Sequence, residues 1–139
     1  MSINVPEGFV LWSRTSRFLD LVGPIYTSDQ PSFRLALRLD ERHVNRRDFA
    51  HGGLLTSIAD VALGYAGALM TDPPTPLVTV SLSVDFLGSA KRGSWVEFAT
   101  EPPRVGSRLA FVSGAVLADG KTVARTSAVF AVQSQAEKG

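Results

Sequence analysis

The chain has 139 residues, of which 45% are hydrophobic and 19% are charged, and its net charge is +1. This length suits one modest hydrophobic core, so we expect a single domain over residues 1–139. The near-neutral charge, without Lys/Arg runs interleaved with aromatics, argues against nucleic acid as a partner. The chain contains no cysteine, which excludes disulfides and a thiolate nucleophile and fits a cytoplasmic location.

The first 40 residues predict a helical lead-in followed by a strand. Residues 1–8 lack a basic segment followed by an apolar one, so we expect no secretion signal. Within residues 1–23 the spacing of apolar side chains up to about Asp20 predicts a short amphipathic helix. This helix should end before Gly23-Pro24. The second half of residues 25–40 alternates, which predicts a strand whose apolar face carries Phe33, Leu35, Leu37 and Leu39.

The longest apolar stretch runs from Leu54 to Met70 and predicts a buried helix of about five turns. It contains Asp60 and is slightly short for a membrane span, so we expect no membrane association. A carboxylate inside such a helix is costly to bury unless it is hydrogen-bonded or works in a cleft. Helical spacing places small and polar residues on the same face of the helix as Asp60, namely Gly53, Thr56, Ser57, Gly64 and Gly67. We therefore expect this face to contact the same helix of a second copy.

The remainder of the chain predicts antiparallel strands. Residues 71–76 contain three prolines and turn the chain back. Residues 78–86 alternate strictly, which predicts a strand with Val78, Val80, Leu82, Val84 and Phe86 on its apolar face and Thr79 on its polar face. Further strands are predicted over 95–101, 109–117 and 123–132, with Asp119-Gly120 as a hairpin turn and residues 133–139 as a polar tail. We therefore expect an α+β protein with five to six antiparallel strands and one long central helix.

The start of the central helix carries two glycines. Gly52 and Gly53 leave the first helical N–H groups accessible, and such groups stabilise a developing negative oxygen. Eight residues at 1.5 Å per residue place Gly52 and Asp60 about 12 Å apart along the axis, too far for both to touch one reacting carbonyl. If both act on one substrate, they come from different subunits.

The order Asn45, then His51-Gly52-Gly53, then Asp60 on a helix leading into an alternating strand resembles the hotdog-fold acyl-CoA thioesterases of the PaaI-like (phenylacetic acid degradation) branch. The resemblance covers roughly residues 15–133. It implies a hotdog fold, in which an antiparallel sheet wraps around one long helix, and a homodimer that pairs into a dimer of dimers. It also implies an enzyme that hydrolyses acyl-CoA to free acid and coenzyme A without a cofactor. Asp48 departs from the family, since many relatives have glycine there.

The resemblance assigns roles by position. Gly52 matches the glycine whose amide polarises the thioester carbonyl, and Asp60 matches the partner-subunit carboxylate that attacks the carbonyl or activates water. Asn45 and His51 match residues that shape the pocket, and Thr79 matches a position that helps to orient the water or the carboxylate. The expected substrate-binding neighbours are Gly53, Phe49 and Ser57.

Other interpretations stay open at this point. Asp60 could be a structural residue bonded to a neighbouring hydroxyl, and His51 could serve only the helix entrance. The two histidines, His43 and His51, lie eight residues apart and do not favour a metal site. The chain could instead be a non-catalytic acyl-CoA-binding hotdog protein, a hotdog dehydratase or a dimeric scaffold without a ligand. Aromatic and medium-chain acyl groups both suit a pocket formed by Phe49, Leu54 and Tyr65.

Basic residues in the predicted turns have two interpretations, of which the ordinary solvated surface is favoured. In relatives, such residues near the edge of the sheet contact the nucleotide phosphates of coenzyme A. They also suit an ordinary solvated surface; the residues are Lys91, Arg92, Arg104 and Arg108.

Overall fold

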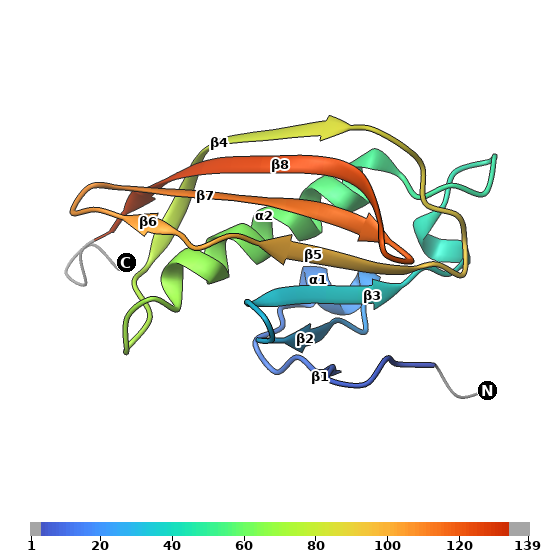
Figure 1. The fold of residues 1–139 in the computed structure, drawn as a ribbon, viewed down its shortest axis with the longest axis horizontal. Helices are drawn as coiled ribbons and strands as arrows, with labels where there is room; N and C mark the ends of the chain where they lie inside the picture. Colours follow the sequence, from blue (N-terminus) through green and yellow to red (C-terminus); the bar gives the residue numbers. More distant parts are fainter. Residues whose placement is uncertain (1–3, 134–139) are drawn as a thin grey trace.

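The computed structural model describes residues 4–133, which form one antiparallel sheet and two helices (Figure 1). The helices are α1 (Arg17–Val22) and α2 (Gly52–Ala68), and a short 3-10 turn spans Glu41–His43. The strands are β1 (Val10–Leu11), β2 (Tyr26–Ser28), β3 (Arg34–Arg38), β4 (Leu77–Phe86), β5 (Trp95–Thr100), β6 (Arg104–Val105), β7 (Leu109–Ala118) and β8 (Lys121–Val132).

This arrangement confirms the α+β class and the single long helix. Within residues 4–133 the sheet has eight strands, so the expected five to six was wrong. The additional strands β1, β2 and β6 have two or three residues each, too few to show an alternating pattern in the sequence. The N-terminal helix also begins later than expected, because Ser16 caps α1 by accepting a hydrogen bond from the Leu19 N–H.

The strands follow the order β1-β2-β3-β5-β7-β8-β4, with β6 paired to β7, and each pairing is antiparallel. The sheet curves over α2, and β4 lies beyond β8 at the edge of the sheet (Figure 1). The two-residue turn between β7 and β8 is the predicted Asp119-Gly120 hairpin, and both residues have positive φ, 49° and 84°. Among the described residues, the ten-residue strand β4 therefore has one paired edge and one unpaired edge.

Helix α2 packs its apolar side against the concave face of this sheet. Its buried side chains include Leu55, Ile58 and Leu63. They meet buried residues of four strands, Leu37, Val96, Phe98, Val116 and Phe130. The helix begins at Gly52, two residues before the predicted start, so both glycines belong to its first turn. Near its end, a Cβ on Gly67 would lie 2.9 Å from Leu77 Cδ1, so glycine permits the close approach of β4.

A β-bulge changes the faces of β4. The register between β4 and β8 shifts between Thr79 and Ser81, which leaves Val80 as the extra residue. Thr79 pairs with Phe130, which is buried against α2, so Thr79 lies on the helix-facing side. The prediction that Thr79 belongs to the polar outer face was therefore wrong. Val80 is 62% exposed and Val78 is 53% exposed, so the expected apolar face is not buried at its first two positions.

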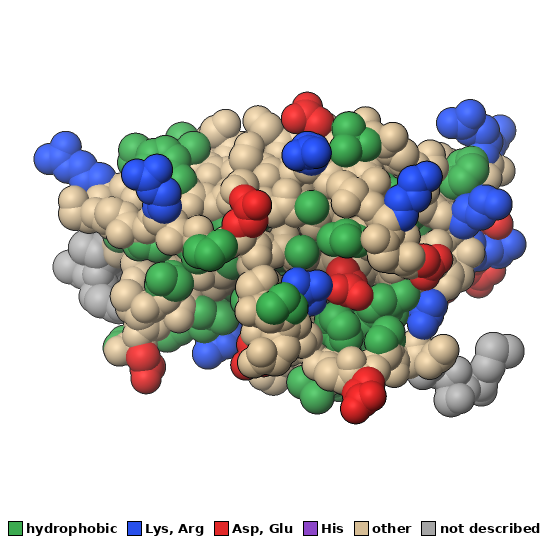
Figure 2. All heavy atoms as spheres, viewed as in Figure 1, with side chains coloured by type: hydrophobic (Ala, Val, Ile, Leu, Met, Phe, Trp, Pro, Cys, Tyr) green, Lys and Arg blue, Asp and Glu red, His purple; other side chains and the backbone are tan. Residues whose placement is uncertain are grey.

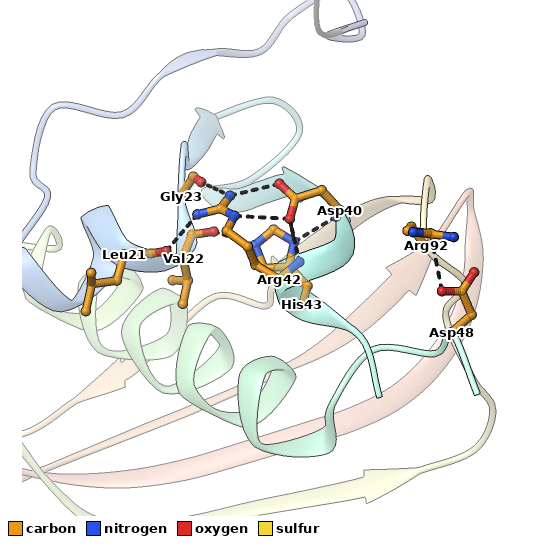
Figure 3. A network of polar contacts seen from close by, with 8 residues as sticks. All are labelled: Leu21, Val22, Gly23, Asp40, Arg42, His43, Asp48 and Arg92. Atoms are coloured by element: carbon orange, nitrogen blue, oxygen red, sulfur yellow. Dashed lines mark hydrogen bonds and ion pairs between the residues drawn. The ribbon is translucent and has the colours of Figure 1, made fainter. Parts of the chain in front are cut away.

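A polar network fixes the loop that leads from β3 toward α2 (Figure 3). The Arg42 guanidinium donates hydrogen bonds to Leu21 O and Gly23 O at the end of α1, and it forms an ion pair with Asp40 at 2.8 Å. Buried His43 accepts from the Asp40 N–H through Nδ1, and its Nε2 lies 2.6 Å from Val22 O. Arg42 lowers the pKa of the Asp40 carboxyl below its usual value. The loop before α2 is thus tied to the N-terminal helix.

Residues 134–139 of the predicted polar tail lie outside the described residues. Between residues 4 and 133, neither helix combines the length and the apolar character that crossing a bilayer requires.

Candidate active site

The first turn of α2 presents free backbone donors. Gly52 and Gly53 are exposed, and their N–H groups belong to the first helical turn, where N–H groups have no intrahelical acceptor. A Cβ on Gly52 would lie 3.2 Å from Phe86 Cζ, so β4 packs closely against the helix start. His51 precedes the helix in an extended conformation, is exposed and makes no side-chain cap hydrogen bond. The helix start thus combines positive dipole character with accessible N–H groups.

Asn45 shapes the loop that precedes this helix. Its Oδ1 accepts hydrogen bonds from the Arg47 N–H at 2.9 Å and the Phe49 N–H at 3.2 Å. Its side-chain oxygen is therefore engaged within the loop. Asp48 follows in the left-handed region with φ 71°, the conformation that glycine adopts most easily, and its carboxylate pairs with Arg92 at 3.2 Å. The loop thus accommodates Asp48 in a backbone conformation that favours glycine.

Asp60 lies near the middle of α2 and is half-buried. The Thr79 Oγ1–H donates a hydrogen bond to Asp60 Oδ1 at 2.7 Å. This contact exists because the bulge in β4 turns Thr79 toward the helix. One turn before Asp60, the Ser57 hydroxyl donates to Gly53 O at 2.8 Å, so it belongs to the helix backbone network. The structure therefore brings Asp60 and Thr79, which are 19 residues apart in the chain, into direct contact.

A cavity of about 550 Å³ opens beside this pair. Its walls come from α2, β4, β8 and the proline-rich loop between α2 and β4, and include Val61, Gly64, Tyr65, Leu77 and Phe130. Of the three residues expected to line an acyl pocket, Tyr65 does so, whereas Phe49 and Leu54 lie outside the lining of this cavity. Arg14 also lines it; no sequence pattern pointed to this residue, because it is far from Asp60 along the chain.

The helix start and the Asp60 site are separate within one protomer. Both belong to the regular helix α2, so Gly52 and Asp60 are about 12 Å apart along its axis. The cavity beside Asp60 does not include Gly52, His51 or Asn45. Within residues 4–133, no group of three or more His, Cys, Asp or Glu side chains is close enough to hold a metal ion. The described residues thus offer two groups at separate places in the protomer: the backbone N–H donors at the start of α2 and the carboxylate of Asp60.

Comparison with known proteins identifies the family of the chain. The family model described as the thioesterase superfamily matches residues 48–125. A provisionally named esterase of Pseudomonas aeruginosa is 46% identical over 130 residues, covering 92% of this chain and 97% of that protein. A mutant of the phenylacetic acid degradation protein PaaI from Thermus thermophilus has a TM-score of 0.70 at 22% identity, covering 84% and 98% of the two chains. A Bacillus halodurans protein solved with CoA has a TM-score of 0.69 at 22% identity, covering 77% and 71%.

These likenesses confirm the hotdog fold and the resemblance to the PaaI-like proteins. The matched segment contains Gly52, Asp60 and Thr79, together with the strands from β4 to β7 and the start of β8. The chain therefore belongs to the thioesterase superfamily, whose reaction is the hydrolysis of thioesters.

Proposed function

We propose that this protein hydrolyses acyl-CoA thioesters to the free acid and coenzyme A, at a site that two copies of the chain share. The observation that carries the proposal is the Asp60–Thr79 pair at the wall of an open cavity. This carboxylate is ordered and accessible, and it lies about 12 Å along the helix from the backbone donor of its own chain. A second copy supplies the missing donor.

The sheet edge supports a shared site. β4 is ten residues long and, within residues 4–133, pairs only with β8, so its other edge offers unpaired N–H and C=O groups to another strand. Large apolar side chains are exposed along it, with Val80 at 62% and Phe86 at 49%. Pairing of β4 with the β4 of a second copy would cover these side chains and continue the sheet. Because Thr79 on β4 holds Asp60, the partner would also approach the carboxylate.

We assign to the Gly52 amide the role of binding the thioester carbonyl oxygen. As a thioester carbonyl is attacked, its oxygen gains negative charge, and a fixed N–H at the positive end of a helix stabilises that charge. The helix start is exposed, so a substrate from the shared cleft can reach the N–H. Glycine also keeps the approach open, since a side chain here would meet Phe86.

We assign to Asp60 the attack on the thioester carbonyl carbon, either directly or through a water molecule. Thr79 occupies Oδ1, and within residues 4–133 no hydrogen bond reaches Oδ2, which is free to react. Oδ2 either attacks the carbon, forming an anhydride and expelling the CoA thiolate before water cleaves the anhydride, or removes a proton from the attacking water. In both routes the products are the acid and the CoA thiol. No metal is needed, because the amide provides the electrophilic assistance.

Basic residues near the helix start support the choice of coenzyme A. Arg46 and Arg47 lie in the loop before α2, and exposed Lys91 and Arg92 lie beside this loop through the Phe49–Lys91 bridge and the Arg92 N–H bond to Asp48 O. Figure 2 shows Lys and Arg side chains gathered at this end of the molecule, at the right of the view. Such cations attract phosphates, so we assign them to the nucleotide part of the substrate.

The test is a hydrolysis assay over a panel of acyl-CoA thioesters with the wild type, Asp60→Asn and the control Asp29→Asn. Asparagine keeps the size of the side chain and still accepts the Thr79 hydrogen bond, but it supplies no carboxylate. We expect kcat to fall by at least about a hundredfold, the scale of losing one activating group. Asp29 lies between β2 and β3, away from β4, is exposed and does not line the cavity, so its variant should retain wild-type rates.

The same variants separate the alternatives. A non-catalytic acyl-CoA-binding protein would bind CoA with or without the Asp60 carboxylate and would show no turnover that depends on it. A dehydratase would convert 3-hydroxyacyl-CoA into enoyl-CoA without releasing a thiol. Equal thiol release by the wild type and Asp60→Asn would refute the catalytic role of Asp60.

A further inference from the structure

We propose that Arg14 selects acyl groups that end in a carboxylate, so that the preferred substrates are CoA monothioesters of dicarboxylic acids. This inference rests on the proposed acyl-CoA hydrolysis and names its substrate class. It starts from the cavity beside Asp60, to whose wall the N-terminal segment contributes Arg14.

The cavity is positioned to hold the acyl part of the substrate. It adjoins the reacting pair, Asp60 and Thr79, and extends along α2 past Tyr65 to Ala68 and the proline-rich loop. The basic residues that we assign to the CoA phosphates lie beside the first turn of α2, and none of them lines this cavity. A thioester that reacts at Asp60 with its nucleotide part elsewhere therefore directs its acyl chain into this cavity.

Among the residues that the structure describes, Arg14 is the only cation that lines the cavity, and its charge is available. Besides Arg14, the lining residues with polar side chains are Asp60 and Thr79, which serve the reaction, Tyr65, and Thr75, whose hydroxyl is bonded to Thr71. Arg14 takes part in none of the ion pairs found within residues 4–133. A guanidinium offers a planar fork of donors that matches a carboxylate in two parallel hydrogen bonds.

The backbone on both sides of Arg14 is anchored. On one side, buried Trp12 stacks edge-on against Tyr65 with ring centroids 5.0 Å apart, and its backbone N–H donates to Ile25 O at 2.9 Å. On the other side, Ser16 caps α1, and the Thr15 hydroxyl donates to Asp20 at 2.6 Å. The base of the Arg14 side chain is therefore fixed beside Tyr65, and less conformational entropy is lost when it binds a ligand.

The charges in the cavity also predict a length preference. Asp60 repels a second carboxylate close to the thioester, whereas Tyr65, beside which Arg14 is anchored, lies five residues further along α2, about 7.5 Å along the axis. A carboxylate next to the thioester, as in malonyl-CoA, meets the repulsion without reaching Arg14. A longer chain, as in adipoyl-CoA, carries its carboxylate past Asp60 toward the guanidinium.

The experiment measures kcat/KM for adipoyl-CoA and hexanoyl-CoA, which have equal chain lengths and differ in the terminal carboxylate. The proteins are the wild type, Arg14→Leu, Arg14→Lys and the control Arg17→Leu, an exposed arginine of α1 that does not line the cavity. We expect Arg14→Leu to lower the adipoyl value at least about tenfold and to change the hexanoyl value by less than about twofold. Arg14→Lys should retain part of the preference, and Arg17→Leu all of it.

Two further readouts make the result specific. Added salt should lower the adipoyl value more than the hexanoyl value in the wild type, and this difference should vanish in Arg14→Leu. The wild type should also hydrolyse adipoyl-CoA faster than malonyl-CoA. A wild type that cleaves hexanoyl-CoA but rejects adipoyl-CoA, or an equal loss on both substrates in Arg14→Leu, would overturn the role of Arg14 and leave acyl-CoA hydrolysis intact. A wild type that cleaves no acyl-CoA would overturn both proposals.

Discussion

The Gly52 amide can be tested by removing its hydrogen while keeping the helix. Gly52→Pro deletes the N–H, and proline is well tolerated at the first helical position, where no intrahelical bond is lost. The preceding residue, His51, already has φ −62° and ψ 133°, the conformation that proline favours in its predecessor. The matched control is Gly52→Ala, which keeps the N–H but adds a Cβ 3.2 Å from the Phe86 ring.

Loss of one donor to a developing oxyanion lowers kcat by about 10²- to 10³-fold, and we expect this loss for Gly52→Pro. Gly52→Ala should lose less, because only the contact with Phe86 changes. Activity would be followed by release of the CoA thiol, and folding by the thermal unfolding midpoint. Equal losses in folded Gly52→Pro and Gly52→Ala would show that the side-chain volume matters and the N–H does not.

Mixing two inactive variants tests whether the site is shared. In a heterodimer of Gly52→Pro and Asp60→Asn, one site carries both changes and the other carries neither. Random exchange makes half of the dimers heterodimers, so the mixture should recover about one quarter of the wild-type activity. Native mass spectrometry would show whether the mixture contains heterodimers. If heterodimers are present and no activity is recovered, the assignment of the two groups to different subunits is refuted.

Three further changes have defined outcomes. Thr79→Val removes the hydroxyl that holds Asp60, and we expect kcat to fall about tenfold with little change in KM, whereas Thr79→Ser should stay near wild type. Val80→Lys places a charge on the exposed β4 edge and should shift sedimentation toward the monomer and lower activity together; a fully active monomer would contradict the dimer. Because Arg42 lowers the pKa of Asp40 in the folded state, the Asp40 carboxylate stabilises the fold above its usual pKa of 3.8, and this contribution is lost as pH falls further. The difference in unfolding midpoint between wild type and Asp40→Asn should therefore shrink below about pH 4, and a difference that is independent of pH would contradict this assignment.

The sequence by itself determined those helices and strands whose hydrophobic pattern extends over many residues. The apolar run after His51-Gly52-Gly53 forms a helix because almost every side chain in it can be buried, and α2 fills the concave side of the sheet. The Asp119-Gly120 hairpin was also predicted, since a two-residue turn with positive φ needs such residues. The unusual carboxylate Asp60 marked the candidate site before any neighbour was known.

Only tertiary structure decided how Thr79 reaches Asp60. Strict alternation in residues 78–86 placed Thr79 on the outer face, but the bulge before Ser81 reverses that assignment. A bulge depends on the register with β8, which lies far along the chain, so alternation within β4 cannot reveal it. The short strands β1, β2 and β6 were missed for the same reason: their few residues become strands only through pairing with other segments.

Tertiary structure also decided which residues surround the cavity and which sheet edge stays open. Sequence spacing describes neighbours along one helix or strand, whereas Arg14 and Tyr65 meet in one cavity because Trp12 anchors the N-terminal segment on α2. The exposed apolar residues of β4 looked like a core face in the sequence, because periodicity shows which residues share a face and does not show whether that face is buried in the protomer. Sequence patterns thus marked the candidate reacting groups, and the packing of distant segments determined their surroundings.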